Sequence, residues 1–433
     1  MKKFILFNLI LLCSLYVQGQ SQLLEQYRAM ALDYSHDLHA AEKNIAASME
    51  VERSARADLK PKLSADANFQ YTGNPMELNI DLPSMSAPLT FQGRDLKYGA
   101  SLTLLQPVYT GGQLLESIRL ARHRQSLANG QADVLRSSVC YQTDIQYWNT
   151  VARKEIVGVT ADFRESVASL AQTIRERVDA GLADPQDLLM AEVRLNDADY
   201  QLLQAQNSFE TGRMALNSLI GVALEAPTET DTTIPQVKWA SDSLLAADGS
   251  FRPELRMAHD QIRIAESSLK LNDARFKPKF YVGLDGSYSS PGYNFKSDLD
   301  PNYAVYAKLS VPLFEWGKRR NEKRASKLRI GMANDNLNRV QDDIRLEVQT
   351  ARVSLIQALE RVRLSESSLE KAKENEQKAL ERYTEGRISI VEVIDAQTYR
   401  QTSQVNYVQA RAAAQIQYSA LLKATNRYNM ASR

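Results

Sequence analysis

Four short segments of the chain alternate between apolar and polar residues, and they form two pairs. The first pair is 63–72 and 97–106, and the second pair is 280–289 and 302–311. A period of two predicts β-strands with one apolar and one polar face. Each run has about nine to eleven residues, which is the length that a tilted strand needs to cross a bilayer.

The segments that follow each strand pair show helical periodicity over long distances. No proline interrupts 112–181 or 317–386, and in the second stretch apolar residues recur at spacings of three, four or seven from Ile344 to Tyr383. This spacing predicts a narrow coiled-coil seam. A helix of roughly seventy residues would be about 100 Å long, several times the usual length in globular proteins. A cytoskeletal type of coiled coil would share this pattern but would not contain the strands.

The same order of elements occurs twice in the chain. The segment 59–63 recurs 217 positions later around Pro278, and 107–112 recurs 205 positions later as 312–317. Glu176, Arg177 and Gly181 also recur 205 positions later. The sequence therefore predicts two copies of one unit. The predicted divisions are a first copy at 21–224, a polar linker at 225–250, a second copy at 251–427 and a tail at 428–433.

Proline and glycine residues mark the points where the predicted strands meet the helices. We expect these strand–helix junctions at Pro61, Pro107, Gly112, Pro278, Pro312 and Gly317.

Each long helix is followed by the sequence signals of a tight helical hairpin. Gly181 and Gly386 suit the left-handed residue that ends a helix. Asp184 then precedes a proline, and Ser389 with Glu392 forms a capping-box pattern. Both sites are therefore predicted to be hairpin tips at matching places in the two copies.

The first twenty residues have the layout of a secretory signal. Two lysines precede an apolar run from Phe4 to Leu12, and small and polar residues follow. The run is too short to cross a bilayer as a helix. We expect 1–20 to be removed. The alternative is lipid attachment at Cys13, which the sequence does not favour because Leu12, rather than a small residue, precedes that cysteine. With 1–20 removed, Cys140 would be the remaining thiol.

Composition excludes several classes of function. The chain has 53 basic and 52 acidic residues, so its charge does not favour nucleic-acid binding. After the signal, no apolar run is long enough for a transmembrane helix. His36, Asp37 and His39 lie close together but form a weak metal pattern, and no catalytic or phosphate-binding motif is present. The sequence predicts no enzyme activity, no cofactor and no metal site.

An exported chain without a helical anchor is periplasmic, secreted or an outer-membrane β protein. Two hairpins of a soluble protein, packed on helices, would show the same alternation of apolar and polar residues. A polar face with Asp66, Asp285 and Lys308 suits a water-filled lumen, however, and the apolar face suits lipid. Four strands cannot close a membrane barrel, and hydrocarbon does not tolerate open sheet edges. If the strands span a membrane, several chains must contribute to one barrel.

The repeat resembles that of TolC-like outer-membrane efflux proteins over essentially the whole mature chain. The resemblance rests on the order and duplication of motifs at 252–255, 277–278, 312–317, 382–386 and 390–396. It implies a mainly α fold with a membrane β-barrel part, in which four strands per chain form a twelve-stranded barrel in a homotrimer. The helices would form a tunnel through the periplasm, with the barrel in outer-membrane lipid.

The resemblance also implies roles for single residues at the periplasmic end. Glu392 and Asp395 match an acidic constriction, and Tyr383 and Asp187 match a network that holds the end shut. The family often has an arginine where this chain has Ile388, so Arg387 is the candidate substitute in the gate. The tip residues Gly181, Leu182, Gly386 and Ile388 are the expected contacts with a periplasmic adaptor.

The expected function is therefore that of an exit duct in the outer membrane. It would receive drugs, toxic compounds or metal ions from a periplasmic adaptor and an inner-membrane transporter of the RND, ABC or MFS type. An exit duct for type I protein secretion is the alternative. A periplasmic adaptor or coiled-coil scaffold without a channel remains a further alternative, although an adaptor would not contain this duplication.

Overall fold

The computed structural model describes most of the chain. The described ranges are 22–81, 83, 88–237, 247–292 and 298–430. The predicted signal with Cys13, the centre of the predicted linker at 238–246 and the last residues of the predicted tail at 431–433 lie outside these ranges.

The chain forms two compact units, and each unit takes segments from both halves of the sequence. The first contains the described residues within Met1–Glu42, Gly130–Arg256 and Asn338–Arg433. The second contains those within Lys43–Asn129 and Met257–Leu337. A duplicated sequence therefore builds each unit from two parts that are far apart along the chain.

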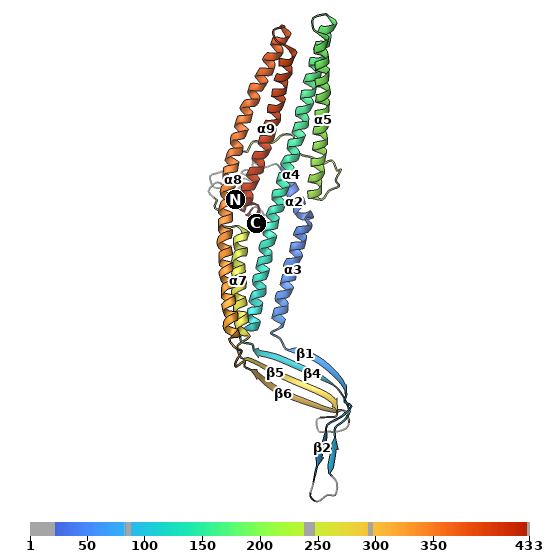
Figure 1. The fold of residues 1–433 in the computed structure, drawn as a ribbon, viewed down its shortest axis with the longest axis vertical. Coiled ribbons are helices and arrows are strands. Elements are labelled where there is room, and N and C mark those ends of the chain that lie inside the picture. Colours follow the sequence, from blue (N-terminus) through green and yellow to red (C-terminus); the bar gives the residue numbers. More distant parts are fainter. Residues whose placement is uncertain (1–21, 82, 84–87, 238–246, 293–297, 431–433) are drawn as a thin grey trace, which may run out of the picture. The chain divides into compact units, whose positions relative to one another are not determined.

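The second unit contains a four-stranded antiparallel sheet (Figure 1). Its strands are β1 (Lys62–Tyr71), β4 (Leu96–Tyr109), β5 (Lys279–Ser290) and β6 (Asp300–Ser310). Their order in the sheet is β1-β4-β5-β6, so the pairing of β4 with β5 joins the two halves of the sequence. The alternating segments of the sequence thus form one sheet.

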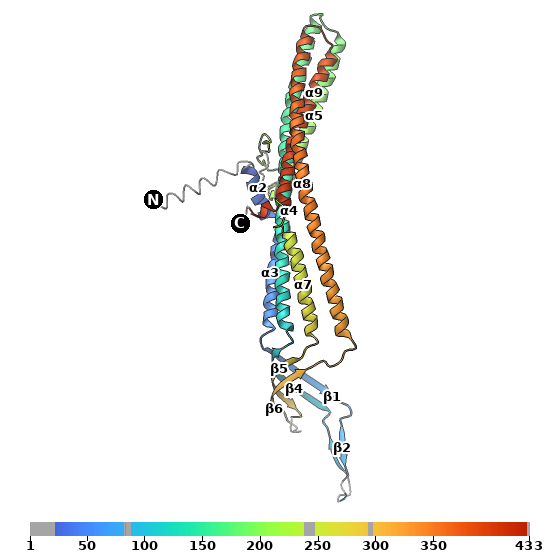
Figure 2. The ribbon, with the colours of Figure 1, turned by 90° about the vertical axis from the view of Figure 1, so that its left-hand side faces the viewer.

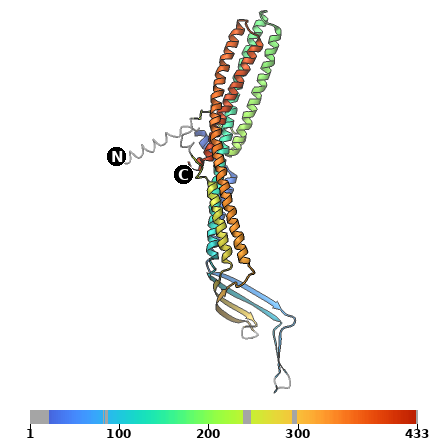
Figure 3. The same cartoon turned by 60° about the vertical axis from the view of Figure 1, so that its left-hand side comes forward.

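A second, shorter hairpin was not predicted. β2 (Glu77–Ile80) and β3 (Leu89–Gln92) pair with each other in the segment between β1 and β4 (Figure 3). Each strand has only four residues. So short a run gives too few alternating positions for a period of two to be recognised.

Two of the helices are very long. α4 (Gln113–Asp179) and α8 (Lys318–Thr384) each have 67 residues, which confirms the prediction of uninterrupted helices. The predicted seam of α8 is also observed, because Ile344, Val348 and Leu355 are buried. Among the described residues, no helix has both the length and the apolar character that crossing a membrane requires.

Polar side-chain contacts join neighbouring helices in the helical part of the second unit. It includes parts of α3 (His36–Ala57), α4, α7 (Pro253–Ala274) and α8. Glu52 of α3 contacts α4, Ser126 of α4 donates to Asp260 of α7 at 2.5 Å, and Asn272 of α7 donates to Ser326 of α8 at 3.3 Å. These contacts place the four helices next to each other in sequence order.

The first unit contains two helical hairpins, α4 with α5 and α8 with α9 (Figure 2). The second helices of these hairpins are α5 (Pro185–Ile220) and α9 (Ile390–Ala424), and the unit also contains α2 (Gln22–Tyr34) and α10 (Arg427–Met430). Tyr147 and Trp148 of α4 are fully buried among residues of α2, α5 and α9. Burial of a large apolar side chain contributes about 1.5–3 kcal/mol, so this aromatic pair is a main support of the unit.

A buried ionic cluster ties α2 and α10 to the centre of α4. The guanidinium of Arg28 donates to both carboxylate oxygens of Asp144, at 2.6 and 2.5 Å, and the side chain of Asp144 is 0% exposed. The Tyr428 hydroxyl donates to the same carboxylate. Because three elements share one carboxylate, the position of both ends of the described chain depends on Asp144.

We expect Asp144→Ala to destabilise the first unit by about 3 kcal/mol, because it removes the buried carboxylate that both Arg28 and Tyr428 contact. Thermal unfolding in detergent, followed by tryptophan fluorescence, measures the effect. Asp199→Ala is the matched control, since Asp199 forms an exposed ion pair with Arg164 and exposed pairs contribute at most about 1 kcal/mol. Equal changes in melting temperature for both variants would show that the cluster has no special role.

Candidate functional site

The register of the sheet separates apolar from polar residues. One row across the four strands consists of Leu63, Leu104, Leu284 and Val305. The neighbouring row, on the other face, consists of Ser64, Thr103, Asp285 and Ala304. Asp66 and Lys308 occupy alternate positions that share this second face. The prediction of a mainly apolar and a mainly polar face is confirmed, although the second face also carries Leu105, Tyr281 and Tyr306.

The apolar face of the sheet is not covered. Leu63 is 70% exposed and Val305 is 72% exposed, and Phe69 and Tyr303 on the same face are also exposed. In soluble hairpins packed on helices these side chains would be buried. That alternative interpretation of the strands is therefore wrong, and the sheet presents a large apolar surface to its surroundings.

Both edges of the sheet are open in the single chain. Within the described residues, β1 pairs only with β4, and β6 pairs only with β5. The outer edges of β1 and β6 therefore present backbone N–H and C=O groups without partners in this sheet. These edges are therefore available for pairing with strands of another chain.

The predicted junction residues lie at or near the strand ends. Pro61 and Pro278 come directly before β1 and β5, and Gly112 and Gly317 take the left-handed conformation just before α4 and α8, with φ of +88° and +78°. Pro312 follows β6.

Pro107 is an exception, because it lies inside β4 rather than after it. The register shifts between Pro107 and Tyr109, and such an irregularity accommodates a residue that has no N–H to donate.

The two hairpin tips have the same backbone structure. At the α4–α5 tip, the Leu182 N–H donates to the Arg177 carbonyl at 2.7 Å, and Gly181 has a φ of +70°. At the α8–α9 tip, the Arg387 N–H donates to the Arg382 carbonyl at 2.9 Å, and Gly386 has a φ of +73°. Both are Schellman motifs that satisfy the last carbonyls of the helix.

The starts of the second helices are also capped as predicted. The Asp184 carboxylate accepts from the Gln186 N–H at 2.8 Å. At the other tip, the Ser389 N–H and hydroxyl both donate to the Glu392 carboxylate at 3.3 Å. The Glu392 carboxylate therefore stabilises the start of α9, whatever other role it has.

Tyr383 joins the two hairpins near their tips. It is buried in a cluster that includes Ile174 of α4, Ala191 of α5 and Val393 of α9. The Arg177 guanidinium lies 5.3 Å from the centre of the Tyr383 ring, and it donates to the Thr384 carbonyl at 3.4 Å. Arg177 therefore links the end of α4 to the end of α8 by a cation–π contact and a hydrogen bond.

The structure also brings Asp187 into the surroundings of Tyr383. Burial raises the pKa of the Tyr383 hydroxyl, the Arg177 charge opposes this, and the Asp187 charge reinforces it. No role was predicted for Arg177 from the sequence. The sequence singles out Arg177 only because Glu176 and Arg177 recur at 381–382 in the repeat. This recurrence does not predict which residues Arg177 contacts.

The other predicted gate residues lie on the surface of the single chain. Glu392 and Asp395 are exposed, and the Asp395 carboxylate has no hydrogen-bond or ion-pair partner within the described part of the chain. Arg387 is exposed and contacts Glu385 at 3.2 Å rather than either of these acids. At the tips, Leu182 is 70% exposed, and Ile388 packs against the cluster around Tyr383.

Comparison with known proteins identifies the family. The family described as "Outer membrane efflux protein" matches residues 28–222 and 250–427. The chain therefore belongs to this family, whose proteins reside in the outer membrane and act in transport.

Two curated relatives are distant in sequence, and a solved structure is similar in fold. Outer membrane efflux protein BepC of Brucella suis is 22% identical over 335 residues, which cover 75% of this chain and 71% of BepC. Cobalt-zinc-cadmium resistance protein CzcC of Cupriavidus metallidurans is 24% identical over 218 residues, 48% of this chain and 49% of CzcC. The crystal structure of CusC has a TM-score of 0.79 at 16% identity and covers 94% of this chain and 92% of CusC.

We expect Gly386→Ala to loosen the α8–α9 tip. No atom would touch the added methyl group within 4 Å, so the effect comes from the positive φ alone and amounts to about 1 kcal/mol. Amide exchange of the tip residues should become about fivefold faster in hydrogen-exchange mass spectrometry.

Gly331→Ala is the matched control for this change. Gly331 also has no atom within 4 Å of an added methyl group, but it lies inside α8, where alanine favours the helix. Exchange around Gly331 should slow. Faster exchange at both sites, or at neither, would contradict a conformational role for Gly386.

Proposed function

We propose that this protein is one subunit of a homotrimeric exit duct in the outer membrane. Four strands from each chain would form a twelve-stranded barrel, and the long helices would form a tunnel through the periplasm. The observation that carries the proposal is the sheet itself, which combines an exposed apolar face with two open edges. Lipid would cover the apolar face, and neighbouring chains would pair the edges.

The duct would conduct passively and would not be an enzyme. Its polar strand face, with Asp66, Asp285 and Lys308, would line a water-filled lumen. Energy for export would come from partners, namely a periplasmic adaptor and an inner-membrane transporter of the RND, ABC or MFS type. The two-copy division at 21–224 and 251–427, with the linker 225–250 between them, is part of this proposal.

The gate would lie at the periplasmic end of the tunnel. In a threefold assembly, copies of Glu392 and Asp395 would form an acidic ring that attracts cations and resists passage. The contacts around Tyr383, Arg177 and Asp187 support a closed arrangement of the hairpins within one chain. Arg387 is the proposed substitute for a lock arginine at the position that Ile388 occupies.

The hairpin tips would receive the adaptor. Leu182 is exposed, and Gly181 and Gly386 fix the turns that present the tips. Ile388 lies at the base of the second tip, where it packs against the buried cluster.

We propose small molecules as the cargo, that is drugs, toxic compounds or metal ions. The names of BepC, an efflux protein, and CzcC, a cobalt-zinc-cadmium resistance protein, support this class. A duct for type I protein secretion is the second candidate. An adaptor or scaffold without a channel would lie in water, where a sheet with an uncovered apolar face is unfavourable.

We expect the purified protein to form ion channels in planar lipid bilayers. The double variant Glu392→Gln with Asp395→Asn should make these channels less sensitive to block by cations. The double variant removes the acidic ring, and glutamine at position 392 can still accept the capping hydrogen bonds. The concentration of a trivalent cation that halves the current should rise at least about tenfold, because a ring of fixed carboxylates concentrates cations at the constriction.

Glu370→Gln with Glu374→Gln is the matched control, because both carboxylates are exposed on α8 and neither lies at a tip. Cation block should be unchanged in this control. Equal block in all three proteins would contradict a role of either acid in the gate and would leave Glu392 with its role in capping α9. Absence of channels in the unsubstituted protein would contradict the duct itself.

A further inference from the structure

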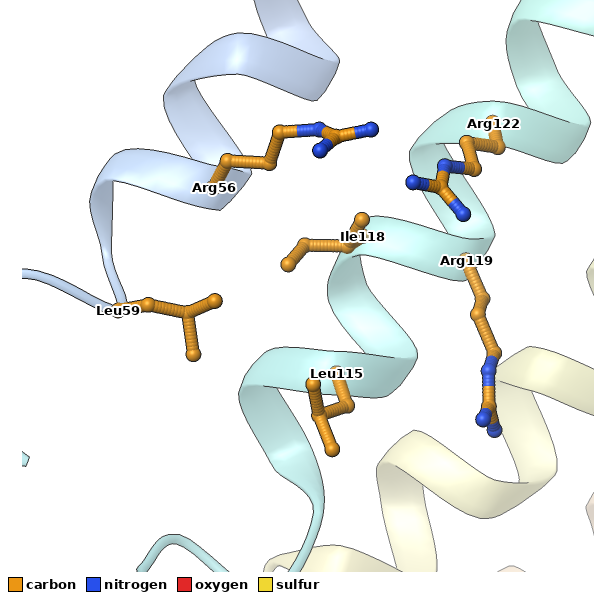
Figure 4. Close-up of a pocket in the computed structure, with 6 residues that line it drawn as sticks. All are labelled: Arg56, Leu59, Leu115, Ile118, Arg119 and Arg122. Atoms are coloured by element: carbon orange, nitrogen blue, oxygen red, sulfur yellow. The ribbon is translucent and has the colours of Figure 1, made fainter. Parts of the chain in front are cut away.

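A hollow of about 340 Å³ lies between α3 and α4, close to the point where these helices meet the sheet (Figure 4). Its lining combines three arginines with three aliphatic residues, which are Arg56, Leu59, Leu115, Ile118, Arg119 and Arg122. All six belong to the second unit. A mixed lining of this kind suits a ligand with both an anionic and an apolar part.

Two of the arginines form a preorganised cationic pair. Arg56 and Arg122 point toward each other in Figure 4, whereas Arg119 points away from them toward the neighbouring helix. The Glu52 carboxylate accepts from Arg56 at 2.8 Å and from Arg122 at 2.7 Å. One carboxylate between two guanidinium groups holds both in place and leaves a net positive charge.

The pair retains donors for a ligand. Arg122 contacts Glu52 through Nε, and its two terminal nitrogens have no acceptor among the described residues. The Arg56 and Arg122 side chains are 54% and 52% exposed. Guanidinium groups bind phosphate through pairs of parallel hydrogen bonds, so these free donors fit a phosphate group.

The apolar part of the hollow lies on the strand side of the arginines. Leu59 follows Arg56 by one helical turn and comes just before β1, and Leu115 lies in the first turn of α4, about two turns before Arg122. Leu59 and Leu115 are exposed. The lining thus changes from basic to apolar in the direction of the sheet.

A hydrogen bond indicates which face of the sheet the hollow adjoins. Gln106 lies on the same face as Leu104, because alternate residues of β4 share a face up to the register shift at Pro107. The Gln106 side chain donates to the Leu59 carbonyl at 3.0 Å. Leu59 therefore lies on the side of the uncovered apolar face, which is the side proposed to face lipid.

We propose that this hollow binds an anionic phospholipid of the outer membrane's periplasmic leaflet, with the phosphate on Arg56 and Arg122 and the acyl chains toward Leu59 and Leu115. The inference rests on the proposed function, since it requires the apolar sheet face to lie in lipid. The net positive charge favours a lipid such as phosphatidylglycerol over a zwitterionic lipid of the same chain length.

Native mass spectrometry of the purified protein in a nonionic detergent tests the proposal. We expect phosphatidylglycerol to bind at least about tenfold more tightly than phosphatidylcholine with the same acyl chains. Arg56→Gln with Arg122→Gln should weaken phosphatidylglycerol binding about tenfold, the factor that one lost charge-assisted hydrogen bond produces. Leu115→Ser should weaken binding of both lipids, and inorganic phosphate should not displace the bound lipid.

Arg53→Gln with Arg124→Gln is the matched control, because it removes two exposed charges from the same two helices outside the hollow. Lipid binding should be unaffected by this control. The proposal is overturned if both lipids bind equally or if the two double variants behave alike. Displacement of the lipid by inorganic phosphate would also overturn it, since it would indicate a site for free anions.

Channel recordings on the same preparations separate this proposal from the duct. If the protein forms channels but does not prefer phosphatidylglycerol, the lipid site alone is contradicted. If the protein forms no channels, the proposed function is contradicted. If Arg56→Gln with Arg122→Gln fails to fold, Leu115→Ser still tests the lipid site. Unchanged lipid binding by Leu115→Ser would contradict the apolar half of the site.

Discussion

The unpaired backbone at the two edges of the sheet is the constraint from which the rest of the structure follows. An apolar face drives the sheet toward lipid, but an N–H or C=O group without a partner costs several kcal/mol in hydrocarbon. The chain presents an uncovered apolar face and open edges at β1 and β6 together. A single sheet in lipid would leave these edge groups without partners, whereas the proposed closure with further copies would pair them and cover the apolar face with lipid.

The duplication explains how a single sheet and two hairpins are built from one long chain. β4 of the first copy pairs with β5 of the second, so the sheet contains no boundary between the copies. In the first unit, Tyr383 and Arg177 join the hairpin of one copy to the hairpin of the other. A change at these contacts would alter the relation between the two hairpins, which is the type of movement that the proposed gate requires.

The regular elements were predictable because their signals are local and repeated. The alternation in 63–72 and 280–289, the absence of proline from 317–386 and the cap at Ser389 each depend on neighbouring residues. The β2–β3 hairpin was missed because four residues per strand give too little alternation. The position of Pro107 inside β4 was missed because its register shift depends on pairing with β5.

Contacts between distant residues could not be predicted in the same way. Asp144 is an ordinary acid in the sequence, and only the fold brings Arg28 and Tyr428 to it. The same holds for Arg177 at Tyr383 and for Glu52 between two arginines. The proposed gate residues Glu392 and Asp395 lie near the start of α9, next to the predicted tip, but the acidic ring proposed for them requires other chains.

Cross-linking between the sheet edges tests closure across chains most directly. Asn68→Cys in β1 and Ala304→Cys in β6 would be combined with Cys140→Ala, which removes the buried native thiol. Within one chain the two strands are about 14 Å apart, so a maleimide cross-linker of about 8 Å cannot join them, whereas strands paired across chains are about 5 Å apart. Covalent dimers and trimers, and nothing larger, are the predicted products in outer membranes. Uncross-linked chains, or products larger than a trimer, would contradict a closed trimeric sheet.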